Sequence, residues 1–361
     1  MKIIKSLMAN KRRLAAFLLA ILSLTAAVHG VESPLELGQL IMVGFSSTEV
    51  SPGLRRSIEE GKIGGVLLLG KNVRNPQQFA RLMADLKAIP APAPLLIALD
   101  QEGGRVVRLS PAKGFPGFPT ARIVAQQYST AEAYALYSQM ALMLKDYGVN
   151  VNFVPVVDID INPNSPIIGQ LGRSFSADPA MVASYAEQMI LAHRAQGIIT
   201  CAKHFPGHGS ATVDSHLGIT DVTTSWSSLE LSPYRYLLAH QLLDLVMPAH
   251  IYNQAIDQAF PASLSKKHLQ GILRGEIGYQ GVIISDDLMM GGVTTLFSFE
   301  AIVLNALQAG EDILLFSSTD PRLAEKITAV IGRGLADGRL SAAEIRLSLE
   351  RIKRLKERLA H

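Results

Sequence analysis

Cysteine and tryptophan are nearly absent from this sequence of 361 residues, which contains one of each, Cys201 and Trp226. A single cysteine excludes an intramolecular disulfide, so the fold must be stabilised by a hydrophobic core. The residues around Cys201 are apolar or small, which predicts a buried and unreactive thiol. The single tryptophan disfavours a long binding groove lined by aromatic rings and favours a short pocket.

An excess of charge is also absent once the first thirty residues are set aside. The formal net charge is +3, and residues 1–30 contain five basic and no acidic residues, so the remainder carries −2. With the body near neutrality, the high pI of the whole chain is not evidence for nucleic-acid binding. We therefore expect no nucleic-acid partner.

Residues 1–30 follow the three-part pattern of a secretory signal peptide. The basic stretch KRR at 11–13 precedes an apolar run at 14–28, and small residues are placed for cleavage before Val31. The run is shorter than the ~20 residues that a membrane-spanning helix needs, so no stable span is expected after cleavage. The alternative is an uncleaved N-terminal anchor; a lipid anchor is disfavoured because no cysteine lies directly after the run. We expect an exported protein, periplasmic or secreted, or a membrane-anchored one if the segment is retained.

Short apolar runs alternate with longer amphipathic stretches in the rest of the chain. The runs are rich in Val, Ile and Leu with little polar alternation, which is typical of strands buried on both faces of a parallel sheet. The stretches between them have helical spacing, as at 76–89 and 177–197, and a last helix over 341–360 opens with a Ser341–Glu344 capping box. The predicted strands are 40–45, 64–70, 94–100, 151–160, 198–204, 242–250, 281–287 and 312–318.

Strands that alternate with helices eight times over ~320 residues predict a (β/α)8 TIM barrel. An open, doubly wound sheet is the alternative. No internal repeat, low-complexity tract or Pro/Ser-rich linker divides the chain. We therefore expect residues 31–361 to form one domain behind the signal peptide or anchor at 1–30.

Titratable side chains recur at the carboxyl ends of the predicted strands. In a barrel these strand ends meet at one rim, where the active site lies. Groups that converge there from several strands would line a single pocket. The residues concerned are Asp100, Asp158, Lys203 with His204, His250 and Asp286.

The stretch KHFPGHGSATVDSH at 203–216 allows two kinds of chemistry. A loop could gather His204, His208, Asp214 and His216 on a metal ion, although the proline and glycines argue against a helical zinc motif. Alternatively, Asp214 lies two residues before His216, and a carboxylate at hydrogen-bond distance orients an imidazole. Such a pair can protonate a leaving oxygen and then activate water.

The stretch SDD at 285–287 ends the seventh predicted strand. Alternation along a strand points Asp286 and Asp287 to opposite sides. One of them can face the barrel mouth, while the other caps the following helix or meets solvent. A carboxylate at this rim can attack an anomeric carbon and hold a covalent glycosyl intermediate.

Taken together, five stretches of the sequence resemble glycoside hydrolase family 3, in its β-N-acetylglucosaminidase branch. The stretch at 203–216 is similar to the signature of that branch. The resemblance covers residues 37–318, with the blocks in the order of the family. The other blocks are DQEGGRVVRL (100–109), GRSFSADP (172–179), VMPAHI (246–251) and GVIISDDLMM (281–290).

The resemblance implies a role for eight residues. Asp286 matches the nucleophile, His216 matches the general acid/base, and Asp214 matches the partner of that histidine. The residues that match those gripping the terminal sugar are Asp100, Arg108, Arg173, Lys203 and His204.

Four further residues are expected to have structural roles. Arg105 is expected to form an ion pair with Glu102. Asp158 and His250 match rim positions that we expect to support the pocket wall rather than to take part in catalysis.

The resemblance implies a retaining exo-glycosidase, a β-N-acetylhexosaminidase that needs no cofactor. Its glycan substrate would carry terminal β-linked N-acetylglucosamine, on cell-wall (peptidoglycan) fragments or chitooligosaccharides. One-domain relatives commonly recycle such fragments in the cytoplasm, so the export signal is a departure from their pattern. Three alternatives stay open: a metal-dependent hydrolase using the 204–216 loop, a phosphorylase of the same family, and a barrel that binds carbohydrate without catalysis. No feature of the sequence indicates an oligomeric state.

Overall fold

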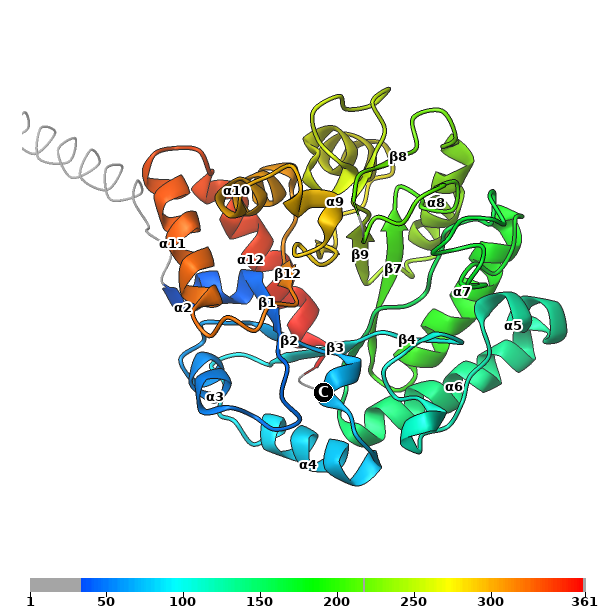
Figure 1. Cartoon of the computed structure of the whole chain (residues 1–361), viewed down its shortest axis with the longest axis horizontal. Helices are drawn as coiled ribbons and strands as arrows, with labels where there is room; N and C mark the ends of the chain where they lie inside the picture. The colour runs from blue at the N-terminus through cyan, green and yellow to red at the C-terminus, as the bar shows by residue number, and fades with distance from the viewer. Residues whose placement is uncertain (1–33, 217, 360–361) are drawn as a thin grey trace, which may run out of the picture. The chain divides into compact units, whose positions relative to one another are not determined.

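Eight parallel strands form a closed barrel in the computed structural model, which describes residues 34–216 and 218–359 (Figure 1). The strands pair with their neighbours in chain order, and β11 meets β12 through a bridge between Ile284 and Ile313. This closure confirms the predicted (β/α)8 barrel over the open sheet. The strands are β1 (Ile41–Gly44), β2 (Gly65–Leu68), β3 (Leu96–Leu99), β6 (Val151–Asn152), β7 (Ile199–Phe205), β9 (Leu245–Pro248), β11 (Val282–Ile283) and β12 (Leu314–Phe316).

Helices surround the strands on the outside of the barrel (Figure 1). One principal helix follows each barrel strand, as the alternation of apolar runs and amphipathic stretches predicted. These helices are α3 (Pro52–Glu59), α4 (Pro76–Lys87), α6 (Thr130–Tyr147), α7 (Pro179–Arg194), α8 (Ser232–Ala239), η6 (Lys267–Glu276, a π-helix), α10 (Phe299–Ala309) and α11 (Leu323–Ala336). A ninth long helix, α12 (Ala342–Glu357), ends the described chain.

Shorter elements lie in the connections between strands and helices. Two strand pairs stand apart from the barrel: β4 with β5 is antiparallel, and β8 with β10 is parallel. The short strands are β4 (Gln101–Gly103), β5 (Val106–Val107), β8 (Thr220–Asp221) and β10 (Ile251–Tyr252). The short helices are α2 (Pro34–Leu37), η1 (Gly38–Leu40), η2 (Gly70–Asn72), η3 (Pro111–Lys113), α5 (Ala121–Gln127), η4 (Ser228–Leu231), η5 (Ala262–Leu264) and α9 (Gly291–Thr294).

Local sequence signals account for many helix boundaries. Ser129 begins α6 with a reciprocal capping box to Glu132, and Gly148 ends that helix in the left-handed conformation that glycine adopts at low cost. Asn75 caps α4 by accepting a hydrogen bond from the Gln78 amide. The predicted cap at Ser341 is also present, since its hydroxyl accepts from the Glu344 amide at the start of α12.

The barrel interior and the layer under the helices are apolar. The residues of the eight barrel strands are buried along their whole length, as expected for a sheet covered on both faces. Cys201 lies in β7 with no exposed surface, and burial raises the pKa of its thiol well above the ordinary value. The predicted burial of this thiol is therefore confirmed, and a thiol kept neutral by burial is a poor nucleophile.

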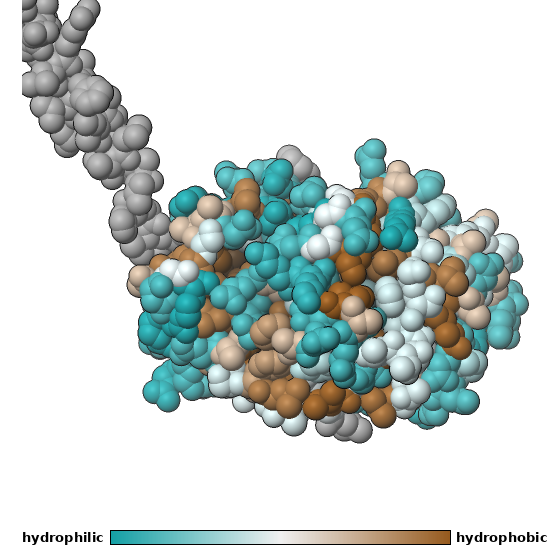
Figure 2. Space-filling model, turned by 90° about the horizontal axis from the view of Figure 1, so that it is seen from above, coloured by the Kyte–Doolittle hydropathy of each residue, from teal (hydrophilic) through white to brown (hydrophobic). Residues whose placement is uncertain are grey.

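Residues Pro34–His361 form one unit. None of the helices that the structure describes has the length and apolar character required to cross a membrane. On the face shown in Figure 2, hydrophobic residues are interspersed among hydrophilic ones. The predicted signal peptide at 1–30 lies outside the described residues.

Helix α12 lies against the amino-terminal ends of the barrel strands. The Lys356 ammonium donates hydrogen bonds to Oε1 of Gln39 (2.6 Å), before β1, and to the carbonyl of Gly64 (2.8 Å), before β2. Ser348 donates to Asp312, which precedes β12. Lys356 is buried, and burial lowers the pKa of its ammonium to about 7. The rim formed by the carboxyl ends of the strands therefore lies at the opposite end of the barrel from α12.

Replacing Lys356 by methionine should change how stability depends on pH. Between the folded pKa of about 7 and the ordinary value of 10.5, the unfolded chain binds the extra proton. The wild type should therefore gain stability over the K356M variant as pH rises, by on the order of 2 kcal/mol between pH 7 and pH 9. Urea denaturation at both pH values measures this difference. A constant difference between the two proteins would contradict the burial of a titrating ammonium at this position.

Candidate active site

All eight residues predicted from the family resemblance line one pocket at the carboxyl ends of the strands. The pocket has a volume of about 450 Å³. Asp100 follows β3, Lys203 and His204 belong to β7, and Asp286 follows β11. The other lining residues of the predicted set, on connecting segments, are Arg108, Arg173, Asp214 and His216. The structure thus brings together groups that are separated by up to 186 positions, Asp100 to Asp286, in the sequence.

The floor of the pocket is built around the buried ammonium of Lys203. Its Nζ lies 2.7 Å from Oδ1 of Asp100 and 2.7 Å from Oε1 of Glu102. Burial lowers the pKa of Lys203, but the two carboxylates raise it by more, so the ammonium stays charged. Burial likewise raises the pKa of Asp100, whereas Lys203 and Arg108 lower it by more, which keeps this carboxylate ionised.

A tight hairpin formed by β4 and β5 brings the side chains of Glu102 and Arg108 to this floor. Gly103 turns the chain with a φ of +107°, and a side chain there would meet the carbonyl of Pro119 at 2.2 Å. The Gln101 side chain accepts hydrogen bonds from the amides of Arg108 (3.1 Å) and Leu109 (3.0 Å). The returning strand therefore brings the Arg108 guanidinium to within 2.7 Å of Oδ2 of Asp100.

Glu102 is a site residue that the sequence prediction underestimated. Arg173 binds its carboxylate with two hydrogen bonds of 2.8 Å, from Nε to Oε2 and from Nη2 to Oε1. Burial raises the pKa of Glu102, but Arg173 and Lys203 lower it to about 2. The expected Glu102–Arg105 pair is not formed, because Arg173 and Lys203 occupy both oxygens. Alternation along a strand would have indicated this, since Glu102 lies two positions after Asp100 and so shares its side.

Asp158 orients the histidine of the pocket wall. One of its oxygens lies 2.7 Å from Nδ1 of His204, and the other accepts the backbone amides of His204 (3.2 Å) and His208 (2.7 Å). Burial raises the pKa of Asp158, and the two histidines lower it by more, so it is ionised. Asp158 thus supports the pocket from behind, as expected, and leaves Nε2 of His204 on the side of Arg173 at 3.4 Å.

The Asp214–His216 pair forms on the loop that follows β7. Oδ1 of Asp214 lies 2.7 Å from Nδ1 of His216 and also accepts the His216 amide (2.9 Å). A proton on Nδ1 in this bond leaves Nε2 to exchange a proton with a bound molecule. The imidazole is 58% exposed, so it lies at the open side of the pocket rather than on its floor.

Asp286 faces the same pocket with a carboxylate that is kept ionised. Burial raises its pKa, while His250, His204 and His216 together lower it below the ordinary value. One of its oxygens accepts the Asp287 amide at 2.8 Å. A half-buried carboxylate held in the anionic form at the end of a barrel strand is suited to nucleophilic attack.

The neighbouring Asp287 neither caps the following helix nor simply meets solvent, the two options that strand alternation left for it. Its side chain accepts hydrogen bonds from the amide (2.9 Å) and hydroxyl of Ser317, which follows β12. It also accepts the Met289 amide at 3.1 Å. The predicted rim residue His250 contacts the Asp287 carbonyl through Nε2 (3.1 Å) and Ser263 through Nδ1 (2.7 Å). Asp287 therefore joins the ends of β11 and β12, and His250 supports that junction.

The four candidate metal ligands of the 204–216 loop have separate partners. His204 is held by Asp158 and His216 by Asp214, while Nε2 of the buried His208 lies 3.0 Å from the Ser215 hydroxyl. Burial lowers the pKa of His208 to about 4, so its imidazole is neutral. Within the described ranges 34–216 and 218–359, no group of three or more His, Cys, Asp or Glu side chains is placed to hold a metal ion.

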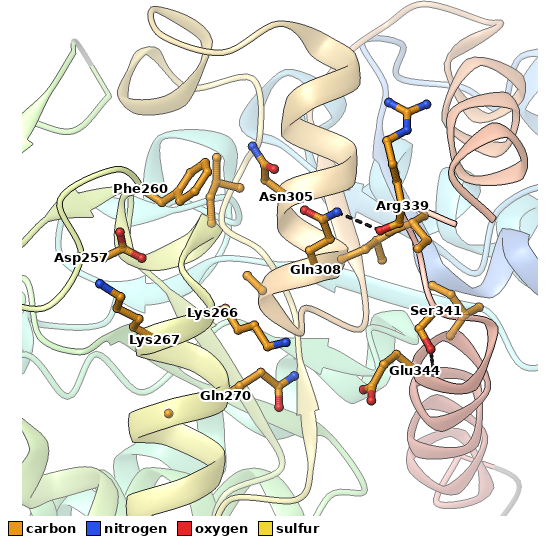
Figure 3. Close-up of a pocket in the computed structure, with 16 residues that line it drawn as sticks. Asp257, Phe260, Lys266, Lys267, Gln270, Asn305, Gln308, Arg339, Ser341 and Glu344 are labelled. Carbon is orange, nitrogen blue, oxygen red and sulfur yellow. Dashed lines mark hydrogen bonds between the residues drawn. The ribbon is translucent and has the colours of Figure 1, made fainter. Parts of the chain in front are cut away.

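A larger groove of about 990 Å³ lies away from this pocket, between η6, α10 and the segment that leads into α12 (Figure 3). Its labelled side chains include Lys266, Lys267, Asn305 and Glu344, and the Gln308 amide donates to the carbonyl of Arg339 (2.8 Å). None of the residues predicted for the active site lines it. Its size alone does not make it the centre of the chemistry, because the converging charged groups are at the barrel rim.

The family follows from a match over almost the whole described chain. Residues 34–355 match the family described as "Glycosyl hydrolase family 3 N terminal domain". The chain belongs to glycosyl hydrolase family 3. The fold and the blocks that carried the resemblance are thereby confirmed, while the roles of the eight individual residues remain predictions.

Curated and solved relatives share most of this chain. A β-hexosaminidase from Aromatoleum aromaticum is 37% identical over 292 residues, which cover 78% of this chain and 79% of that protein. β-Hexosaminidase A from Pseudoalteromonas piscicida is 31% identical over 376 residues, covering 93% of this chain and 62% of that protein. The solved structure of a glycoside hydrolase family 3 β-N-acetylglucosaminidase from Paenibacillus sp. matches with a TM-score of 0.84 and 33% identity, covering 92% of this chain and 63% of that one. The chain thus spans less than two thirds of two of these three relatives.

Replacing Lys203 by methionine should destabilise the fold, because the change leaves the half-buried Asp100 and the buried Glu102 carboxylates with one cation fewer. Removing one partner of a buried charge cluster costs on the order of 3 kcal/mol. Urea denaturation at pH 7 measures the loss. The matched control is K326M, which removes an exposed ion pair with Asp320 and should change stability little. Equal stabilities for the two variants would contradict the description of the floor as a charge cluster.

Proposed function

We propose that the protein is a retaining exo-glycosidase that hydrolyses terminal β-linked N-acetylglucosamine. The observation that carries the proposal is the placement of an ionised carboxylate, Asp286, in the same pocket as the Asp214–His216 pair. Retaining glycosidases need a nucleophile on one side of the anomeric carbon and a proton donor beside the leaving oxygen. The names of the relatives, β-hexosaminidase and β-N-acetylglucosaminidase, support the choice of sugar.

The reaction would proceed in two displacements. In the first, an Asp286 oxygen forms a bond to the anomeric carbon while the bond to the leaving oxygen breaks, and Nε2 of His216 gives that oxygen a proton. In the second, the neutral imidazole takes a proton from water, the water oxygen bonds to the anomeric carbon, and the Asp286 carboxylate leaves. Asp214 stabilises the imidazolium that is present before the first step and again after the second.

The charged floor explains why the enzyme would remove terminal sugars. Oxygens of Asp100 can accept hydrogen bonds from sugar hydroxyls, and the guanidinium of Arg108 and the ammonium of Lys203 can donate to others. Lys203 and its partners fill the barrel below, so a chain cannot pass through the pocket. A pocket of about 450 Å³ that is closed at its floor therefore suits one sugar ring at the end of a glycan.

The proposal includes a location and a substrate source. The signal-like segment at 1–30 supports export, to the periplasm or the medium, where peptidoglycan fragments or chitooligosaccharides would be met. Phosphate could replace water in the second displacement, because an imidazole repels an anion less than a second carboxylate would. The same experiment can therefore test hydrolysis, phosphorolysis and metal dependence.

The mature chain, residues 31–361, should release the aryl group from an aryl β-N-acetylglucosaminide and not from the aryl β-glucoside, with EDTA present. Adding inorganic phosphate should leave free N-acetylglucosamine as the product. Loss of activity with EDTA and its recovery with Zn²⁺ would support the metal-dependent alternative, and a sugar 1-phosphate would support a phosphorylase. Failure to release the aryl group from either aryl glycoside would contradict the proposed function.

Two matched variants separate the role of Asp286 from a general effect of losing a carboxylate. D286N should lower kcat/KM by at least about a thousandfold, because the amide is a poor nucleophile. D320N removes a half-exposed carboxylate that does not line the pocket and should leave the rate unchanged. A D286N variant with near wild-type activity would remove Asp286 from the mechanism.

A further inference from the structure

The loop that carries the acid/base pair is anchored by backbone contacts at both ends. Near β7, Asp158 holds the amides of His204 and His208. At the far end, the carbonyls of Ser215 and His216 accept the amides of Gly292 (3.0 Å) and Gly291 (3.3 Å), from the segment that follows Asp286. Asp214, which orients the imidazole, lies on the stretch between these anchors, so the position of the pair depends on the path of that stretch.

Glu230 of η4 lies directly under the first turn of that path. Its side chain has no exposed surface, and Oε2 accepts the Gly209 amide at 3.1 Å. Its other oxygen, Oε1, and the hydroxyl of Ser210 are both buried without a hydrogen bond of good geometry. A buried polar pair of this kind is costly unless the two groups satisfy each other.

Two glycines allow the loop to approach Glu230 this closely. A side chain at Gly207, where φ is +125°, would lie 2.4 Å from Cβ and 2.5 Å from Oε2 of Glu230. A side chain at Gly209 would lie 1.7 Å from the carbonyl of Ile159 on the opposite side. The turn is therefore held between Glu230 and the segment after β6, with no room for any residue larger than glycine.

We propose that Glu230 is a positioning residue of the acid/base apparatus: its buried carboxyl holds the Gly207–Ser210 turn and thereby aims the Asp214–His216 pair into the pocket. This inference rests on the proposed function, because it assigns Glu230 a part in proton transfer by His216. Glu230 does not line the pocket and would not touch the sugar.

The chemical form of Glu230 suits this part. Burial and, to a smaller extent, the Asp158 carboxylate raise its pKa to about 8, against the lowering effects of Ser210 and of the Gly209 and Ser227 amides. The other titratable group that interacts with it is the Tyr234 phenol of α8, whose own pKa is raised well above the ordinary value by burial. At neutral pH the carboxyl is therefore mostly neutral and can accept from Gly209 while donating to Ser210. A glutamine offers the same acceptor and a donor, whereas alanine offers neither.

The test compares E230A and E230Q with the wild type on two aryl β-N-acetylglucosaminides, one with a 2,4-dinitrophenyl and one with a phenyl leaving group. The first leaving group needs no proton, so kcat/KM for it does not depend on the position of His216. We expect E230A to lose at least about tenfold more activity on the phenyl substrate than on the dinitrophenyl substrate. E230Q should recover most of that loss, and azide, which attacks without losing a proton, should raise kcat of E230A on the dinitrophenyl substrate.

E187A is the matched control, since Glu187 of α7 accepts a hydrogen bond from Tyr236 outside the loop. It should retain wild-type rates on both substrates. Equal losses of E230A on the two substrates, or no loss, would overturn the proposal. A wild type that cleaves neither substrate would instead contradict the proposed function, which keeps the two failures distinct.

If E230A does not fold, the alkaline part of the pH profile decides. Above pH 8 the wild-type carboxyl becomes charged beside the ionised Asp158, which should loosen the turn and lower kcat on the dinitrophenyl substrate, whose second displacement uses the neutral His216 imidazole as base. E230Q cannot ionise, so its rate should persist to higher pH. Coincident alkaline limbs for the two proteins would overturn the proposal.

Discussion

The site depends on one buried ammonium, that of Lys203, between the carboxylates of Asp100 and Glu102. Each of these charges would be costly to bury alone, and each is kept ionised by the others. Arg108 and Arg173 then attach to the same two carboxylates from separate connecting segments. The cluster therefore draws β3, β7 and two loops together and forms a rigid, hydrogen-bonding floor that apolar packing could not provide.

The catalytic groups proposed above this floor have contrasting environments. Asp286 is held ionised by three nearby histidines against the effect of burial, while the His216 imidazole is more than half exposed on a glycine-containing loop. A nucleophile must be fixed relative to the sugar, whereas a group that serves first as acid and then as base must reach both a leaving group and water. The backbone amides of Gly291 and Gly292 donate hydrogen bonds to the loop that carries His216. These bonds fix the position of the proposed acid/base pair relative to the segment that carries Asp286.

Much of the barrel could be predicted because its signals are local. Apolar runs, helical spacing and the caps at Ser129 and Ser341 lie within short stretches of sequence, and the ends of five predicted strands indicated the rim residues. What could not be predicted depends on contacts between distant segments. The partners of Asp287 and Glu230 come from Ser317 and Gly209, 30 and 21 positions away, and no periodicity in the sequence relates them. Glu102 is an intermediate case: alternation placed it beside Asp100, but its pairing with Arg173 required the fold.

The covalent intermediate on Asp286 is the central claim, and trapping it is the most direct test. An H216A variant incubated with 2,4-dinitrophenyl β-N-acetylglucosaminide should form the glycosyl-enzyme without an acid and hydrolyse it slowly without a base. Mass spectrometry of the intact protein and of its fragmented peptides should then find one N-acetylhexosamine unit attached to Asp286. Continued turnover with no adduct, or an adduct on another residue, would contradict the mechanism.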